Sequence, residues 1–233
     1  MKIVTWNCNG AFRKKYESLD EFDADLLVIQ ECEDPSRSIP EYAAWAGNHL
    51  WTGYIKNKGI GVFARKGIKL ETLSWPDDNL QQFLPCRVND SFNLIAVWTL
   101  QANSPTFQYI GQFWKYLQIN KERMSGTNTV ICGDFNSNVI WDKWDRWWNH
   151  SDVVRELAEL GIHSMYHELM GEAQGKETAP TLFMHRKKDR PYHIDYAFAT
   201  KNLMEDGSVT VGEPDTWLNH SDHMPLAFRL TMS

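Results

Sequence analysis

The chain has 233 residues, of which 42% are hydrophobic and 23% are charged, and its formal net charge at pH 7 is −6. This composition excludes disordered and fibrous proteins, and the length is enough to bury a substantial core. The acidic charge argues against a protein that holds nucleic acid by bulk electrostatics, but it is compatible with a local basic groove on an acidic body.

The predicted strands follow one another closely along the chain. Apolar and β-branched runs of strand length indicate them, and they cover residues 2–7, 25–31, 50–55, 60–65, 92–100, 129–134, 193–199 and 225–230. Helical patterns lie at residues 10–22, 106–124 and 151–161, the last with Ser151 as N-cap and Gly161 as terminator. Many strands and few helices favour an α/β fold of two packed sheets covered by helices on their outer faces.

No segment of the sequence indicates export, membrane insertion or a second domain. The opening MKIVTWN lacks the pattern of a signal peptide, and no apolar run reaches the length of a membrane span. The four cysteines form no CxxC pair, so buried reduced thiols are expected rather than a zinc site. We therefore expect residues 1–233 to form a single domain of a monomeric cytoplasmic protein that does not contact membranes.

Polar side chains recur at or beside the ends of the predicted strands. In chain order they are Asn7, Glu31, Asp134, Asn136, His193, Asp195, Asp222 and His223. Because side chains alternate along a strand, His193 and Asp195 of the HIDY segment are expected to share one face. Ligand sites in layered α/β folds gather where strand ends meet, so these side chains are expected in one cleft.

This set of side chains suits a hard divalent cation and a phosphate ester. Mg²⁺ prefers oxygen ligands, commonly one or two carboxylates together with water and phosphate oxygens. Hydrolysis of a phosphodiester needs an oriented water, a base for its proton, and positive charge facing the transition state. A histidine held by a carboxylate supplies that charge, and Asp195 with His223 would be such a pair.

Each of these motifs also has an ordinary structural interpretation. QE at a strand end is often a solvated terminus, GDFN is typical of a tight turn with an Asx hydrogen bond, and SDH is compatible with a cap. Their joint occurrence, in this order and each at the end of an apolar strand, favours an active site.

The motifs TWN, QE, GDFN, HIDY and SDHMP together resemble the endonuclease/exonuclease/phosphatase superfamily. Its members include exonuclease III-type AP endonucleases, pancreatic-type deoxyribonucleases, sphingomyelinases and inositol polyphosphate 5-phosphatases. The resemblance spans the whole chain. It implies a four-layer α/β sandwich in which two central, mainly antiparallel sheets are flanked by helices.

The resemblance also implies a metal region. By motif, Glu31 is similar to the metal-binding glutamate of the family, and Asn7 and Asp222 contribute to the region that holds metal and phosphate. The expected cofactor is Mg²⁺, or Mn²⁺ in its place. The family pattern leaves open whether one or two metal ions act.

Four further residues take catalytic roles by the same resemblance. Asp134 is similar to the residue that orients and deprotonates the attacking water, and Asn136 to its partner on the phosphate. His223, held by Asp195, is similar to the histidine that stabilises the transition state. Asn7 also belongs to this catalytic group.

The substrate side of the predicted site departs from the family pattern. Where the family usually presents a histidine or tyrosine, this chain has Trp98 and Thr99. Thr99 can donate a hydrogen bond, and His193 is a candidate to replace the missing cation. Lys187 and Lys188, in a basic segment before HIDY, form either a solvated loop or a phosphate-binding patch.

A tryptophan-rich segment, WDKWDRWWNH at residues 141–150, follows the GDFN motif. Trp141, Trp144 and Trp148 fall at helical spacing and are expected to share a face, which leaves Trp147 pointing elsewhere. The segment is either an aromatic stripe that closes the core or a platform on which nucleic-acid bases stack through Trp147.

The function favoured by these observations is Mg²⁺-dependent hydrolysis of phosphodiesters, by a nuclease that acts on DNA as an endonuclease or exonuclease. A phosphatase or phosphodiesterase for a small-molecule or lipid phosphate is the alternative with the same chemistry. A non-catalytic binding module on this fold is least favoured, because the metal-binding and water-activating residues of the family pattern are all present.

Overall fold

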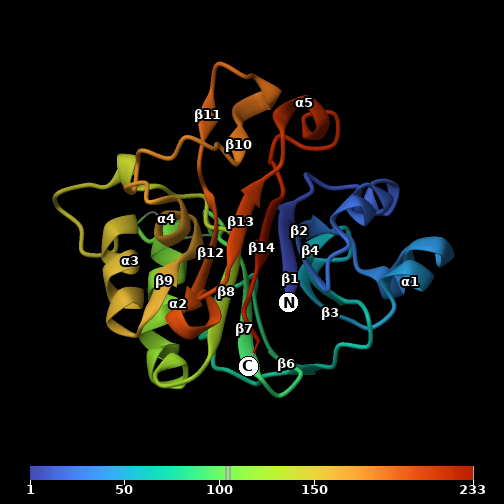
Figure 1. The fold of residues 1–233 in the computed structure, drawn as a ribbon, viewed down its shortest axis with the longest axis horizontal. Helices are drawn as coiled ribbons and strands as arrows, with labels where there is room; N and C mark the ends of the chain where they lie inside the picture. Colours follow the sequence, from blue (N-terminus) through green and yellow to red (C-terminus); the bar gives the residue numbers. More distant parts are fainter. Residues whose placement is uncertain (103, 105, 233) are drawn as a thin grey trace.

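The computed structural model describes residues 1–102, 104 and 106–232, and two six-stranded sheets form its centre (Figure 1). In spatial order, the first sheet consists of β13 (Ser208–Val211), β14 (Leu226–Arg229), β1 (Lys2–Asn7), β2 (Leu26–Cys32), β4 (Lys58–Ala64) and β3 (His49–Ile55). The second consists of β5 (Leu70–Thr72), β6 (Phe83–Val88), β7 (Phe92–Trp98), β8 (Thr129–Asp134), β12 (Asp195–Thr200) and β9 (Ile162–Ser164). A short hairpin pairs β10 (Leu182–Phe183) with β11 (Pro191–Tyr192) and projects beyond one end of the sheets.

Each sheet contains a parallel pair among antiparallel neighbours. β1 runs parallel to β2 in the first sheet, and β7 runs parallel to β8 in the second, whereas the other pairings in both sheets are antiparallel. The prediction of two mainly antiparallel sheets is therefore confirmed. Both parallel pairs send their carboxyl ends toward the same region of the molecule, and this positions the site described below.

The helices at residues 40–46, 110–124 and 150–159 lie on the outer faces of the sheets. The α-helices are α1 (Pro40–Ala46), α2 (Ile110–Met124), α3 (His150–Glu159), α4 (Met165–Met170) and α5 (Pro214–Trp217). The 3₁₀ helices are η1 (Phe12–Lys14), η2 (Tyr16–Phe22), η3 (Pro35–Arg37), η4 (Val139–Trp141), η5 (Met184–Arg186) and η6 (Lys201–Leu203). Figure 1 shows α2 and α3 on one side of the molecule and α1 on the other. None of the described helices is long and apolar enough to cross a membrane.

Three hydrophobic clusters fill the spaces between these layers. Ile3 belongs to the cluster between the two sheets, while Val4 and Trp6 of the same strand pack under η1, η2 and α1. Phe113 and Leu157 bring α2 and α3 onto the outer face of the second sheet. The alternation along β1 follows from the two-residue period of a strand, because both faces of this sheet are covered by apolar side chains.

Several local predictions were wrong. Residues 10–22 form two 3₁₀ helices instead of one α-helix, because Lys15 interrupts them with φ −132° and its carbonyl accepts a hydrogen bond from Ser18 Oγ. Helix α3 has Asn149 rather than Ser151 as its N-cap, and the backbone N–H of Asn149 donates to Asp152 at 2.9 Å. Gly161 follows the helix end with φ +75°, as the expected terminator does.

Strand β6 was not predicted, because Pro85 in its middle argues against a strand inside a sheet. Its position explains why proline is tolerated. The short strand β5 pairs only with residues 86–88, and Pro85 lies just beyond them, where its carbonyl accepts from Leu73 N at 3.1 Å. Pro85 has no backbone N–H, but its nitrogen faces the end of β5, where no partner strand continues. The β5–β6 ladder therefore loses no hydrogen bond.

Candidate active site

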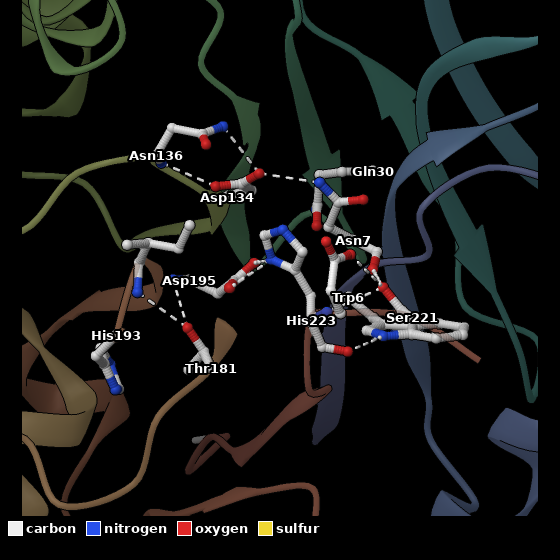
Figure 2. Close-up of polar contacts among 12 residues, drawn as sticks. Trp6, Asn7, Gln30, Asp134, Asn136, Thr181, His193, Asp195, Ser221 and His223 are labelled. Carbon is white, nitrogen blue, oxygen red and sulfur yellow. Dashed lines mark hydrogen bonds and ion pairs between the residues drawn. The ribbon is translucent and has the colours of Figure 1, made fainter. Parts of the chain in front are cut away.

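The topology brings the predicted polar residues to one end of both sheets. Asn7 ends β1 and Glu31 lies near the end of the parallel strand β2, while Asp134 ends β8 in the second sheet. β12 runs antiparallel to β8 with Asp195 opposite Asp134, and His223 lies just before β14, which is antiparallel to β1. Residues from five distant segments of the chain thus meet where the two sheets come together, and Figure 2 shows Asn7, Asp134, Asp195 and His223 around one centre.

His223 and Asp195 form a buried imidazole–carboxylate pair. The His223 Nδ1 atom lies 2.9 Å from one Asp195 oxygen and 3.2 Å from the other. Burial disfavours the charged imidazole, yet the adjacent carboxylates of Asp195 and Asp134 outweigh it and raise the pKa of His223 to about 10. The ring is therefore an imidazolium at neutral pH, and its Nε2–H is available to a ligand because Nδ1 is engaged.

The surrounding backbone holds this pair in place. The Thr181 hydroxyl oxygen accepts from the backbone N–H groups of Ile194 and Asp195, both at 2.9 Å. The Ser221 hydroxyl accepts from His223 N at 3.0 Å and donates to Asn7 O at 2.8 Å. These bonds connect both sheets through the catalytic pair, so its geometry is fixed before any ligand binds.

Asp134 faces the same centre. One carboxylate oxygen accepts from the side-chain amides of Asn7 and Asn136, both at 2.9 Å, and the other accepts from Asn136 N at 2.8 Å. Burial raises the pKa of Asp134 to about 7, although the His223 charge opposes this shift. A carboxylate with this pKa is suited to take a proton from water near neutral pH.

Gly133 explains how the strand that ends in Asp134 fits here. Its φ is +144°, and a Cβ atom at this position would lie 1.9 Å from the Val97 carbonyl oxygen on the neighbouring strand. Only glycine allows β8 to approach β7 this closely while turning Asp134 toward the centre.

Glu31 is presented by a distortion of β2. The register of β2 against β4 shifts between Gln30 and Cys32, and Glu31 at this bulge has φ +61°. A bulge re-aims a side chain, and strained backbone of this kind is typical of functional sites. The Glu31 carboxylate accepts from Lys58 Nζ at 2.7 Å and from the Asn7 amide at 3.3 Å.

The donor set fits a hard divalent cation. The side-chain amide of Asn7 bonds to both Glu31 and Asp134, which places these two carboxylates on either side of one small group. Asp134, Asp195 and His223 offer ligand atoms that all lie within 4.8 Å of one another, but His223 Nδ1 is committed to Asp195. The available ligands are therefore carboxylate oxygens, which Mg²⁺ and Mn²⁺ accept. Asp222 lies at the edge, where it accepts from the Asn9 side chain at 2.9 Å.

Two predicted substrate-binding residues are occupied by the protein itself. The Thr99 hydroxyl is buried and donates to Phe135 O at 2.6 Å. His193 does not share a face with Asp195, because β12 begins only at Asp195 and the His193 ring packs on Tyr196, which points to the opposite side. Burial lowers the pKa of His193, and its ring is directed away from His223 (Figure 2). The structure thus does not bring His193 into the position of the missing cation.

The other predicted substrate-binding residues lie on exposed segments. Lys187 and Lys188 are exposed in the turn between β10 and β11, and Lys188 forms an ion pair with Asp215. The tryptophan segment is not a helix beyond η4, because the Asn149 side chain bonds to the backbone of Lys143 and Arg146 and ties it into a loop. The expectation of a shared tryptophan face was therefore wrong.

The exposure of the tryptophans in this loop differs widely. Trp148 is 7% exposed, whereas Trp144 is 98% and Trp147 is 63% exposed. Trp147 thus presents a free aromatic surface, while Trp148 belongs to the packed interior.

Lys58 and Trp6 were not found by sequence reasoning. Lys58 Nζ bonds to Glu31 across the β2–β4 pairing, and Trp6 Nε1 donates to His223 O at 2.9 Å. A lysine in a polar turn carries no pattern that indicates such a contact. The WN dipeptide was recognised, but only its asparagine was given a role.

Comparison with protein families gives a match over nearly the whole chain. The sequence pattern of the Endonuclease/Exonuclease/phosphatase family matches residues 4–223. The chain belongs to this family. It is therefore a phosphoesterase, of a family whose members depend on divalent metal ions and hydrolyse phosphoester bonds.

Solved structures share the fold of this phosphoesterase. A 3′–5′ exonuclease (NExo) from Neisseria meningitidis superposes with a TM-score of 0.75 at 20% identity, and the alignment covers 100% of both chains. A Neisseria NExo variant, described as a 3′ phosphatase bound to product DNA hairpin, gives a TM-score of 0.76 at 20% identity and the same coverage. An AP endonuclease from Archaeoglobus fulgidus gives 0.70, again at 20% identity over 100% of both chains. Comparison with curated protein sequences finds no match.

Proposed function

We propose that this phosphoesterase is a Mg²⁺-dependent nuclease that cleaves phosphodiester bonds of DNA by attack of water on phosphorus, and that residues 1–233 act as one catalytic domain. The observation that carries the proposal is the buried group of Asp134, Asp195 and His223 beside Glu31. Both sheets contribute to this group, so the two halves of the chain are needed together.

Asp134 prepares the nucleophile. Its carboxylate, held by Asn7 and by Asn136, accepts a proton from a water molecule as the water oxygen bonds to phosphorus. The bond from phosphorus to the leaving oxygen breaks in the same displacement. Because the pKa of Asp134 is about 7, the base form is available from neutral pH upward.

His223 stabilises the charge that develops on the phosphoryl oxygens. Its Nδ1–H donates to Asp195 at 2.9 Å, which leaves the Nε2–H of the imidazolium to donate to a phosphoryl oxygen. Pre-oriented donors of this kind contribute most to catalysis in sites that exclude water, and His223 is only 7% exposed. The Asn136 side-chain amide donates to Asp134 at 2.9 Å and to Thr99 O at 3.1 Å, so it positions the base.

Glu31 is the residue that would hold Mg²⁺, with Asn7 and Asp222 at the edge of the set, while Asp134 acts as the base. A bound cation supplies positive charge to the phosphate and lowers the pKa of attached water. Lys58, bonded to Glu31 at 2.7 Å, balances the carboxylate charge on the same side.

DNA as the substrate is supported by a basic cavity on the Glu31 side of the site. The lining of this cavity of about 500 Å³ includes Arg13, Arg37, Lys56 and Lys58, of which Arg13, Arg37 and Lys58 also form ion pairs with Glu33, Asp34 and Glu31. Local cations of this kind provide phosphate contacts that the net charge of −6 does not provide. Lys187 and Lys188 lie exposed on the β10–β11 turn, where Lys188 forms an ion pair with Asp215. The relatives described as an exonuclease and a 3′ phosphatase bound to a DNA hairpin point in the same direction.

A panel of substrates tests the proposal. Purified protein is incubated with duplex DNA, abasic duplex, single-stranded DNA, RNA, phosphorylated sugars and phosphorylated lipids, each with Mg²⁺, with Mn²⁺ or with EDTA. We expect DNA cleavage that EDTA abolishes, that either cation restores and that His223→Ala lacks. Full activity in EDTA would overturn the role of the metal. Turnover confined to sugar or lipid phosphates would replace the nuclease with the small-molecule phosphoesterase.

A further inference from the structure

Lys58 begins strand β4 at the end of the molecule where the catalytic centre lies. β4 runs antiparallel to β2, with Gly59 opposite Cys32, so its first residue lies beside the end of β2 that carries Glu31. β4 also packs on β7 of the second sheet, and the last residue of β7 is paired with Asp134. The fold therefore places Lys58 beside the centre.

The catalytic centre has more carboxylates than cations. Four carboxylates lie in it or at its edge, namely Glu31, Asp134, Asp195 and Asp222. Two cations form ion pairs with them in the part of the chain that the structure describes, namely His223 and Lys58. A phosphodiester brings a further negative charge, and charge builds up on its oxygens in the transition state. His223 and Lys58 are placed to offset this charge.

The Lys58 ammonium has unused hydrogen-bond donors. A lysine ammonium has three N–H groups, and one of them is used in the bond to Glu31 at 2.7 Å. No other hydrogen bond from this nitrogen occurs within residues 1–102, 104 and 106–232. The side chain is 44% exposed and lines the basic cavity of about 500 Å³. A ligand can therefore reach the two remaining donors.

Glu31 holds this ammonium close to the position of the reacting phosphate. The Asn7 side-chain amide donates to Glu31 at 3.3 Å and to Asp134 at 2.9 Å, so one small group separates the carboxylate that Lys58 contacts from the general base. Because the attacking water bonds to both the base and phosphorus, the phosphate lies next to Asp134. The flexible lysine chain can turn a free N–H toward a phosphate oxygen while the bond to Glu31 is kept.

We propose that Lys58 is a catalytic residue that donates a hydrogen bond to a non-bridging oxygen of the scissile phosphate on the Glu31 side of the centre. This inference rests on the proposed role of the centre in phosphodiester hydrolysis. The ammonium transfers no proton in this step. It stabilises the negative charge that grows on that oxygen while the water oxygen bonds to phosphorus and the leaving oxygen departs.

The kinetics of Lys58→Met and Lys58→Arg on a DNA oligonucleotide test the inference. A pre-oriented donor to the transition state contributes about 10²-fold to turnover, so Lys58→Met should lower kcat by about that factor and change KM much less. Lys58→Arg, which keeps the charge, should restore part of the loss. Lys66→Met is the matched control, because Lys66 also pairs with carboxylates but follows the other end of β4. A loss confined to KM would make Lys58 an ordinary contact to the DNA backbone and would overturn the inference.

A titration with Mn²⁺ separates this role from an indirect role through Glu31. If Lys58 only held Glu31 in place for a metal ion, a saturating concentration of Mn²⁺ would restore the activity of Lys58→Met. We expect kcat of this variant to stay about 10²-fold low at saturation, because the missing donor acts on the phosphate. Full recovery of kcat would contradict a contact between Lys58 and the substrate.

Binding of inorganic phosphate tests the contact without turnover. In EDTA, the His223 ring resonances of ¹⁵N-labelled protein, identified with His223→Ala, report phosphate at the catalytic centre rather than in the basic cavity. We expect the dissociation constant to be about tenfold higher for Lys58→Met, the size of one charge-assisted hydrogen bond, and unchanged for Lys66→Met. If no DNA is cleaved, the nuclease proposal fails, yet this titration still decides whether Lys58 contacts phosphate. Equal constants for Lys58→Met and the unaltered protein would refute the contact.

Discussion

Two regions that meet at Asn136 differ in how their polar groups are satisfied. In the catalytic centre, Asp134, Asp195 and His223 are bonded to one another or to the backbone at 2.8–3.2 Å. In the neighbouring cavity, which Asn136 lines, neither ring nitrogen of the buried His150 has a partner of hydrogen-bonding geometry within residues 1–102, 104 and 106–232, and Arg146 is partly exposed to solvent. The centre is therefore organised in advance for chemistry on a phosphoester, whereas the polar groups of the cavity are less completely bonded.

Asp134→Asn gives the largest expected effect, because it removes the base of the organised region. The amide cannot take the proton of the attacking water, so kcat should fall about 10³-fold or more. The melting temperature should stay the same or rise, since the substitution removes a buried carboxylate. Asp152→Asn, which alters a cap of α3 away from the centre, is the matched control and should affect stability without changing kcat.

Asp195→Asn should lower kcat about 10²–10³-fold and also reshape the pH–rate profile. The reaction needs ionised Asp134 and protonated His223, so the unaltered protein should be most active between pH values of about 7 and about 10. Removal of the Asp195 charge lowers the pKa of His223, so the alkaline limb should move to lower pH. The acid limb should move slightly in the same direction, because Asp195 also raises the pKa of Asp134. His163→Ala is the control, and an unchanged alkaline limb in Asp195→Asn would contradict the pairing.

Trp147→Ala and Trp148→Ala compare an exposed and a buried tryptophan in one loop. Trp148 is 7% exposed, so its truncation to alanine should lower the free energy of unfolding by about 3–5 kcal/mol. Trp147 is 63% exposed, so Trp147→Ala should leave the melting temperature nearly unchanged. If bases stack on Trp147, the substitution should raise KM for a polynucleotide about tenfold. An unaltered KM for Trp147→Ala would remove this tryptophan from the proposed substrate surface.

His150→Phe tests whether the cavity contains a neutral histidine. Burial holds the pKa of His150 at about 3, below its usual value of 6.5, so the unfolded chain binds a proton more readily than the folded one. Stability from this residue is therefore present at pH 7 and is lost as the pH falls through 6.5 toward 3. Between pH 7 and 5 the phenylalanine variant should lose about 1–2 kcal/mol less unfolding free energy than the unaltered protein, as measured by urea denaturation. Equal losses of unfolding free energy in the two proteins would mean that the His150 ring is exposed to solvent.

The Mn²⁺ affinity of Lys58→Met gives the smallest expected effect and probes the metal side of the centre. Lys58 Nζ lies 2.7 Å from Glu31, so its charge competes with a cation for that carboxylate. Calorimetric titration with Mn²⁺ should give a dissociation constant about fivefold lower for the variant, which corresponds to about 1 kcal/mol. Glu31→Gln should raise the same constant, and weaker binding by Lys58→Met would instead make Lys58 part of the metal environment.

The strands and the members of the catalytic centre could be read from the sequence because both depend on local chemistry. Apolar β-branched runs such as TVICG form strands in most contexts, and a polar residue at the end of such a run needs a functional or capping reason. The motifs GDFN, HIDY and SDHMP gave Asp134, Asp195 and His223, which the fold brings together. The glycine of GDFN, Gly133, is required at its position, since its φ of +144° and its contact with Val97 exclude any side chain.

Other features depended on contacts between distant segments. Lys58 reaches Glu31 only through the pairing of β2 with β4, and the role of Pro85 depends on where β5 ends. His193 was assigned to the wrong face because a two-residue period holds only inside a strand, and β12 starts after it.

The sequence by itself determined the reaction class of this phosphoesterase, because the chemistry of phosphate-ester hydrolysis requires particular side chains at the ends of buried strands. The tertiary structure alone decided what surrounds that chemistry. The tryptophans of the loop at residues 141–149 are spaced as in a helix. Hydrogen bonds from Asn149 nevertheless fold this loop back on itself. It lies beside Leu182 and Ile194, which come from segments more than thirty residues away in the sequence. A cavity depends on packing between such distant segments, and no local pattern encodes that packing.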